Sequence, residues 1–107
     1  MLVHVVLFRL RPNLFDGERE TLLRLFERAV REIPSVVRAM IGPRVTHGAG
    51  YEQANRDAFP YAATIEFRDL AGLQAYLQHS AHAEPAQRFF AAIEGSLIAD
   101  YSLETLA

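Results

Sequence analysis

The stretch LVHVVLFRL, residues 2–10, is rich in β-branched and aromatic residues and is too short for a stable helix, so we expect a strand. Successive side chains of a strand point to opposite faces of its sheet. One face would carry Leu2, His4, Val6, Phe8 and Leu10, and the other Val3, Val5, Leu7 and Arg9. Because both faces are mostly apolar, we expect both to be covered in the folded protein.

The rest of the chain alternates between helical and strand-like spacing of apolar residues. After the first strand we expect a helix that is capped by Asp16, runs to about Glu32 and is stopped by Pro34. A strand over 35–48, a polar loop over 48–60 and a strand over 60–69 should follow. The last expected elements are a helix capped by Asp69 that ends near His79, a helix from Pro85 to about Glu94 with Gly95 as its C-terminal cap, and a strand over 96–103. The order β-α-β-β-α-β predicts an α+β fold of the ferredoxin-like class, with a four-stranded antiparallel sheet in one domain spanning 1–107.

The helices of such a fold cover one face of the sheet and leave the other bare. The bare face would hold Val3, Val5 and Leu7. An apolar sheet face of that extent does not stay in water. We therefore expect a homodimer in which two copies pack sheet against sheet, because a two-fold axis lets one patch cover itself.

Composition excludes several classes of protein. The formal net charge is −2, lysine is absent, and the arginines are scattered, which argues against a nucleic-acid or anionic-membrane surface. The absence of cysteine excludes disulfides, thiol catalysis and cysteine-ligated metals. No stretch reaches the roughly 20 apolar residues of a membrane span, so a cytoplasmic protein is expected.

The segment AYLQHSAHAEP, residues 75–85, brings two histidines and a tyrosine close together in the sequence. Tyr76 lies on the inner stripe of its helix and His82 just past that helix. A base and a hydroxyl donor on either side of a carbonyl suit the chemistry of carbon acids. The alternative is that Tyr76 belongs to the core and His82 caps the next helix. His79 and His82 lack a carboxylate at ligand spacing, so no metal site is expected from side chains.

A second polar group is predicted from strand alternation. His4 lies on the same face as Val6, and Asp100 lies on the same face as Ile98. With the ferredoxin-like strand order 4-1-3-2, His4 would lie between Asp100 and Tyr61. A carboxylate beside an imidazole fixes its tautomer. The alternative is a buried polar cluster that only satisfies its own hydrogen bonds.

An ordered set of motifs along nearly the whole chain resembles the stress-responsive α/β-barrel family. The set consists of His4 in HVVLFRLR, Ile33-Pro34 after the first helix, Gly42 in the second strand, the run from Tyr76 to His82, and Ala99-Asp100-Tyr101 in the last strand. The family's central motif is Tyr-x-x-His-Pro-x-His, and Ser80 replaces its proline here. The resemblance implies dimers of ferredoxin-like subunits closed sheet to sheet.

One member of that family, olivetolic acid cyclase, closes a linear polyketide by aldol condensation without a cofactor. The resemblance puts its base at His82, its phenolic partner at Tyr76, and its two other polar residues at His4 and Asp100. Tyr61 stands where that enzyme has a further histidine, so its substrate does not carry over. Some plant members hold magnesium through backbone carbonyls, which would correspond here to Val30, Ile33 and Val36.

Three functions remain open from the sequence. The first is a cofactor-free acid–base enzyme acting on a keto or phenolic compound. The second is a dimer that binds a hydrophobic ligand or protects against stress without turnover. The third is a structural dimer whose core is filled. The residues expected to line a pocket between sheet and helices are Val6, Phe8, Phe26, Tyr61, Leu77 and Ile93.

Overall fold

The computed structural model describes residues 1–107. It contains four strands and four helices. In chain order these are β1 (Leu2–Leu10), α1 (Glu18–Glu32), β2 (Arg38–Pro43), α2 (Tyr51–Ala54), β3 (Tyr61–Phe67), α3 (Leu70–Gln78), α4 (Ser80–Ala92) and β4 (Ile93–Ser102).

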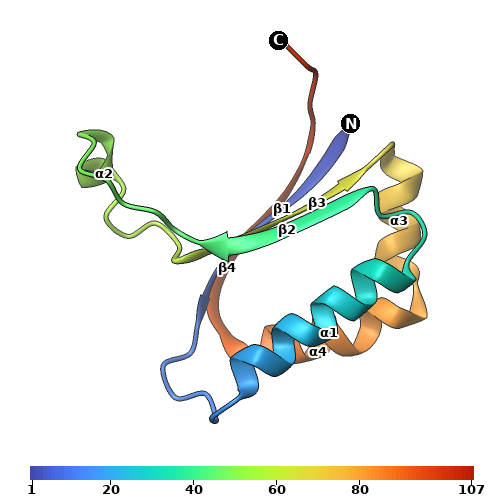
Figure 1. The fold of residues 1–107 in the computed structure, drawn as a ribbon, viewed down its shortest axis with the longest axis horizontal. Coiled ribbons are helices and arrows are strands. Elements are labelled where there is room, and N and C mark those ends of the chain that lie inside the picture. Colours follow the sequence, from blue (N-terminus) through green and yellow to red (C-terminus); the bar gives the residue numbers. More distant parts are fainter.

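The strands form one antiparallel sheet in the order β2-β3-β1-β4. This confirms the ferredoxin-like α+β fold expected from the sequence. Helices α1 and α4 lie side by side on one face of the sheet and α3 packs at one end of that face (Figure 1). The opposite face carries no helix, and α2 lies apart from the sheet on a long connection (Figure 1).

The core lies between the sheet and the helices. Its most completely buried large side chains are Phe67, Ile65 and Ile33, each no more than 2 % exposed. Ile65 and Phe67 come from alternate positions of β3, while Ile33 follows α1. The alternate apolar side chains of β3 therefore pack against the apolar stripe of α1, as expected for a sheet covered on one face.

The start of α1 differs from the expectation that Asp16 caps it. The helix begins at Glu18, and the cap position is Gly17, which has a φ of 81°. Glycine adopts this left-handed conformation without steric cost. The turn at Gly17 separates Asp16 from the helix, and no side chain caps the first turn. The hydroxyl and the backbone N–H of Thr21 both donate to the Gly17 carbonyl.

The second strand is shorter than the expected 35–48 and ends at Pro43. Proline has no N–H to extend a ladder of hydrogen bonds. Beyond Arg44 the backbone no longer pairs with β3. The N–H groups of His47 and Gly48 instead donate hydrogen bonds to the Glu52 carboxylate, which lies in the same connection between β2 and β3. The loop expected over 48–60 contains α2, a single turn of helix that the sequence did not indicate.

The expected break between the two C-terminal helices is present, but it is one residue long. α3 ends at Gln78 and α4 begins at Ser80, so the expectation that the second helix starts at Pro85 was wrong. His79 separates them in extended backbone, and its Nδ1 accepts a hydrogen bond from the N–H of Ala81 at 3.0 Å. Because the His79 imidazole caps the helix, α4 begins at the next residue, Ser80, and Pro85 lies inside the helix.

Gly95 does not cap α4, as the sequence had suggested, but lies inside β4. The helix ends at Ala92 and the strand starts directly at Ile93. The register places Leu10 opposite Ile93 and Arg9 opposite Gly95, so one extra residue, Glu94, is accommodated by a bulge. A bulge turns the strand without ending its pairing, which explains why no loop is needed there.

Asp69 caps α3 as expected, and its loss should be measurable. Its carboxylate accepts a hydrogen bond from the N–H of Gly72 at 2.9 Å. We expect Asp69→Ala to lower the free energy of unfolding by about 1 kcal/mol, because the helix loses a partner for its first turn. Asp16→Ala is the matched control and should change it little, because Asp16 caps nothing. Urea denaturation at one protein concentration measures both, and equal effects would contradict the assignment.

None of the four helices has the length and apolar character that crossing a membrane would require.

Candidate functional site

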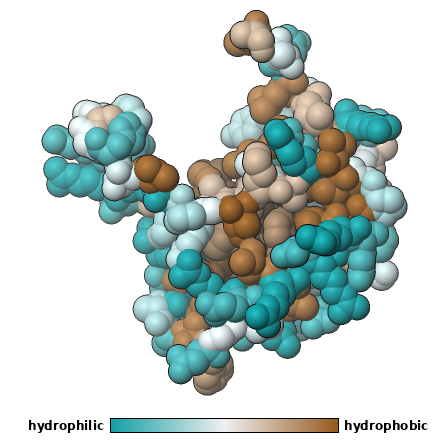
Figure 2. Space-filling view, in the orientation of Figure 1, coloured by the Kyte–Doolittle hydropathy of each residue, from teal (hydrophilic) through white to brown (hydrophobic).

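A cavity of about 440 Å³ lies between the sheet and the helices. This is within the size range of small-molecule sites. Its walls come from all four strands of the sheet and from α1, α3 and α4, and they are mostly apolar. Figure 2 shows hydrophobic side chains gathered in a hollow bordered by the polar surface of α1. The open space contradicts the third possibility raised by the sequence, a structural dimer with a filled core.

Five of the six residues expected to line a pocket do so. They are Val6, Phe8, Phe26, Tyr61 and Leu77. Ile93 is buried but lies outside the lining, because the first residue of β4 packs in the core against Val6, Phe8 and Ala63. The polar residues His4, Tyr76 and His82 also line the cavity, whereas Asp100 lies behind His4.

His4 and Asp100 form a hydrogen-bonded pair that crosses from β1 to β4. They are directly opposite each other in the register, and His4 Nδ1 lies 2.6 Å from Asp100 Oδ1. Because a carboxylate only accepts, Nδ1 carries the proton of this hydrogen bond, and Nε2 is the ring nitrogen that Asp100 does not engage. The His4 side chain is 11 % exposed and that of Asp100 41 %, so the carboxylate reaches solvent while the ring faces the cavity.

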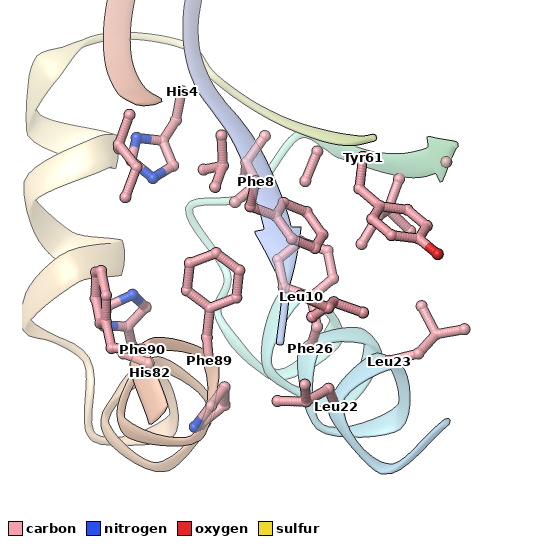
Figure 3. Close-up of a pocket in the computed structure, with 18 of the residues that line it drawn as sticks. His4, Phe8, Leu10, Leu22, Leu23, Phe26, Tyr61, His82, Phe89 and Phe90 are labelled. Atoms are coloured by element: carbon pink, nitrogen blue, oxygen red, sulfur yellow. The ribbon is translucent and has the colours of Figure 1, made fainter. Parts of the chain in front are cut away.

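The expectation that His4 also neighbours Tyr61 was wrong. Ile65 of β3 is opposite His4, and Tyr61 is opposite Phe8, four residues along β1. In Figure 3, His4 and His82 lie at one side of the cavity and Tyr61 at the other, with Phe8 between them. The cavity therefore has two distinct polar ends. We call the end with His4, Tyr76 and His82 the histidine end.

Tyr76 and His82 come together across the break between α3 and α4. The ring centroids lie 4.7 Å apart at an interplanar angle of 64°. His79, which caps α4, puts His82 in the first turn of that helix, where it faces back toward α3. Of the alternative raised by the sequence, one part is contradicted, since His79 and not His82 caps the helix. The other part is confirmed, because Tyr76 is only 4 % exposed and belongs to the core cluster as well as to the cavity wall. Neither the phenol of Tyr76 nor the imidazole of His82 hydrogen-bonds within the chain, and both line the cavity.

Burial shifts the two groups in opposite senses. Burial raises the pKa of Tyr76 to about 12. Burial also lowers the pKa of His82, and the nearby positive charge of protonated His4 lowers it further. At neutral pH the Tyr76 phenol is therefore protonated, and the His82 imidazole is in its neutral form, with one ring nitrogen able to accept a proton. A protonated donor beside an unprotonated base is the combination that general acid–base chemistry uses.

This shift predicts the pH dependence of His82. We expect its imidazole to titrate below the ordinary value of 6.5, so the unprotonated base persists as pH falls through the mildly acidic range. His4→Gln removes the charge of His4, the smaller of the two causes. It should raise the titration midpoint of His82 but leave it below 6.5, because the imidazole is still buried. Titration of the ring carbon-bound protons by NMR measures both. A wild-type midpoint at or above 6.5 would contradict the prediction.

Side chains do not group into a metal centre. No set of three histidine, aspartate or glutamate side chains is close enough to hold an ion. One ring nitrogen of His79, Nδ1, accepts the hydrogen bond from the N–H of Ala81. Among the carbonyls considered for magnesium, that of Ile33 accepts a hydrogen bond from the N–H of Val36 at 3.2 Å.

Residues 2–103 match the family model of the stress responsive A/B barrel domain. The chain belongs to this family. The resemblance seen in the sequence is thereby confirmed. Among curated proteins, none matches the chain significantly.

Several solved structures share the fold of this A/B barrel domain at low sequence identity. The hydroxynitrile lyase of Passiflora edulis is 19 % identical, with a TM-score of 0.82 over 99 % of this chain and 96 % of its own. A dimeric ferredoxin-like protein of unknown function from Thermobifida fusca is 17 % identical, with a TM-score of 0.76 over 95 % and 90 %. A mutant of SnoaB, a cofactor-independent oxygenase from Streptomyces nogalater, is 16 % identical, with a TM-score of 0.68 over 98 % and 95 %. At such identities the likeness shows the fold alone.

Sequence reasoning about this A/B barrel domain missed part of the lining. The missed residues include Arg19, Leu22 and Leu23 of α1, and Phe89 and Phe90 of α4. A signal for Arg19 was present, because it precedes Leu22, Leu23 and Phe26 by three, four and seven positions and so belongs to the same helical stripe. Its charge made it look like a surface residue.

Proposed function

We propose that this A/B barrel domain is a cofactor-independent acid–base catalyst that enolises a keto or phenolic compound held in its cavity. The observation that carries the proposal is the histidine end. There, an unprotonated imidazole and a protonated phenol lie 4.7 Å apart between ring centroids, and neither makes a hydrogen bond to another group of the chain. The apolar remainder of the cavity would exclude water and hold the carbon skeleton.

The reaction step assigns one role to each group. His82 takes a proton from the carbon next to a carbonyl, the C–H electron pair becomes a C=C bond, and the carbonyl π pair moves to oxygen. Tyr76 donates a hydrogen bond to that oxygen, where negative charge develops. The enolate carbon can then attack a second carbonyl, as in aldol closure, or take the proton back from His82. His4, oriented by Asp100, would hold the polar end of the substrate.

Exchange of carbon-bound hydrogen tests this proposal. The probe is 4-phenyl-2-butanone in D₂O near neutral pH, where uncatalysed exchange is slow. We expect the protein to exchange the protons next to the carbonyl at a rate proportional to its concentration, observed by NMR as loss of their signals. Absence of exchange at saturating probe would reject the catalytic proposal.

The second candidate is a non-catalytic binding protein, and the mostly apolar lining of the cavity favours it. Such a lining holds a hydrophobic ligand whatever the protonation state of His82. Saturable binding of 4-phenyl-2-butanone without any proton exchange would support this function over catalysis.

We also propose that the protein is a homodimer joined through the bare face of the sheet, which we call the outer face. Alternation and register place on it Val3, Val5 and Leu7 of β1, Leu97, Ala99 and Tyr101 of β4, and Met40 of β2. The ion pair between Arg38 of β2 and Glu66 of β3 lies on the same face, beside Val3. Leu97 and Tyr101 are 47 % and 51 % exposed in the single chain. An apolar face of this kind is typical of surfaces that associate, and several solved structures with this fold are described as dimeric.

A further inference from the structure

The end of the cavity opposite the histidines carries a positive charge that the proposed acid–base step does not use. Arg19 lines the cavity, and its guanidinium carbon lies 5.1 Å from the centroid of the Tyr61 ring. Among the lining residues it is the only one that is positively charged at every physiological pH. We call Arg19 and Tyr61 the arginine end.

This charge is not neutralised within the chain. No carboxylate lies within 4 Å of the Arg19 guanidinium, and its neighbour in the sequence, Glu18, is paired with Arg88 at 3.9 Å. The Tyr61 ring holds the guanidinium by a cation–π contact but supplies no counter-charge. The planar donors of Arg19 therefore remain free for an anion.

An aromatic wall joins the arginine end to the rest of the cavity. The Tyr61 ring stacks on Phe8, with centroids 5.4 Å apart and planes 20° apart. Phe8 in turn meets the edge of Phe89 at 5.1 Å. Figure 3 shows Phe8 and Phe89 between the two histidines on one side and Tyr61 on the other. A ligand that spans the cavity would thus be polar at both ends and apolar between them.

We propose that Arg19 binds the carboxylate of an elongated, amphipathic carboxylic acid whose carbonyl end reaches His82 and Tyr76. A guanidinium is weakly hydrated and pairs with a carboxylate through two parallel hydrogen bonds, which a neutral analogue cannot form. The histidine end offers the anion less, since the Asp100 carboxylate already pairs with His4 and burial lowers the pKa of His82. This inference rests on the proposed function for the identity of the reacting end, and it names the substrate class as keto acids with an apolar or aromatic spacer.

A pair of probes separates charge from apolar contact. 4-Phenylbutyrate and 4-phenyl-1-butanol share a carbon skeleton and differ in the carboxylate. We expect the protein to bind the acid more tightly than the alcohol in NMR titrations at low ionic strength. Arg19→Gln should weaken binding of the acid by up to about fivefold and leave the alcohol unchanged, because Arg19 is exposed and an exposed ion pair contributes at most about 1 kcal/mol.

Arg24→Gln is the matched control, because it removes the same charge from the exposed side of α1, outside the cavity. It should leave binding of both probes unchanged, and Arg19→Lys should recover part of the affinity for the acid. The proposal is overturned if the wild type binds the alcohol as tightly as the acid, if Arg19→Gln weakens both probes equally, or if Arg24→Gln has the same effect as Arg19→Gln. These titrations need no turnover, so they can fail or succeed independently of the proton-exchange experiment.

Discussion

Proton exchange of 4-phenyl-2-butanone is expected to fall about 100- to 10,000-fold when His82 is replaced by glutamine, which is the usual contribution of a general base. Glutamine is polar and of similar reach, but it cannot accept a proton at neutral pH. The substitution therefore removes the base without emptying the first turn of α4. The rate per protein molecule, measured by NMR at saturating probe, gives the effect.

Two further variants show whether a loss of exchange rate in His82→Gln is specific to the site. His47→Gln changes an exposed histidine that bonds to Tyr51 in the connection between β2 and β3, so it should leave the exchange rate unchanged. Tyr76→Phe keeps the ring packed against Phe67, at 5.3 Å between centroids, while removing the hydroxyl. We expect it to lower the rate by about 100-fold, the effect of losing one donor to a developing oxyanion. A His82→Gln protein that is folded and retains the wild-type exchange rate would end the catalytic assignment.

The second large effect is expected at the outer face. Val5 lies in the middle of β1, opposite Ala99 on one side and Thr64 on the other. In the proposed dimer, Val5→Arg would bury an unpaired positive charge in each subunit. We expect this to weaken association by about 3–5 kcal/mol, or two to four orders of magnitude in the dissociation constant. Sedimentation equilibrium across a range of protein concentrations measures it.

Leu70→Arg provides the comparison for this change. Leu70 is 56 % exposed at the start of α3, away from the outer face, so an arginine there stays in water. We expect this variant to associate like the wild type. A wild-type protein that sediments as a monomer at micromolar concentration, or a Val5→Arg protein that remains a dimer, would refute the proposed interface.

Local patterns were enough to predict most of the fold. Alternation in 2–10 correctly separated the side chains that face the helices, such as His4 and Phe8, from those of the outer face, such as Val5. The helix cap at Asp69 was also predictable, because the cap and its partner are only three residues apart. Errors occurred where a different local bond was available. Gly17, and not Asp16, occupies the cap position of α1. The ring of His79 caps α4, so that helix begins at Ser80, ahead of Pro85.

The candidate site was harder to predict, because it depends on which distant residues meet. The pairing of His4 with Asp100 followed from strand order and alternation. The same reasoning placed Tyr61 beside His4, whereas the register puts it beside Phe8. A shift of four residues along a strand moved Tyr61 to the other end of the cavity. No local pattern sets that register, since it depends on the combined packing of the strands and on the length of the connection between them.

The amino-acid sequence by itself determined the order of strands and helices, the two apolar faces of β1 and the family, because each depends on residues a few positions apart or on motifs in a fixed order. Only the tertiary structure decided that Tyr76 and His82 face each other across a helix break, that Ile93 belongs to the core, and that Arg19 and Tyr61 form a charged end opposite the histidines. The physical reason is that a cavity is the space left when elements from the whole chain pack together. Its shape and its charges therefore depend on contacts that no single segment specifies.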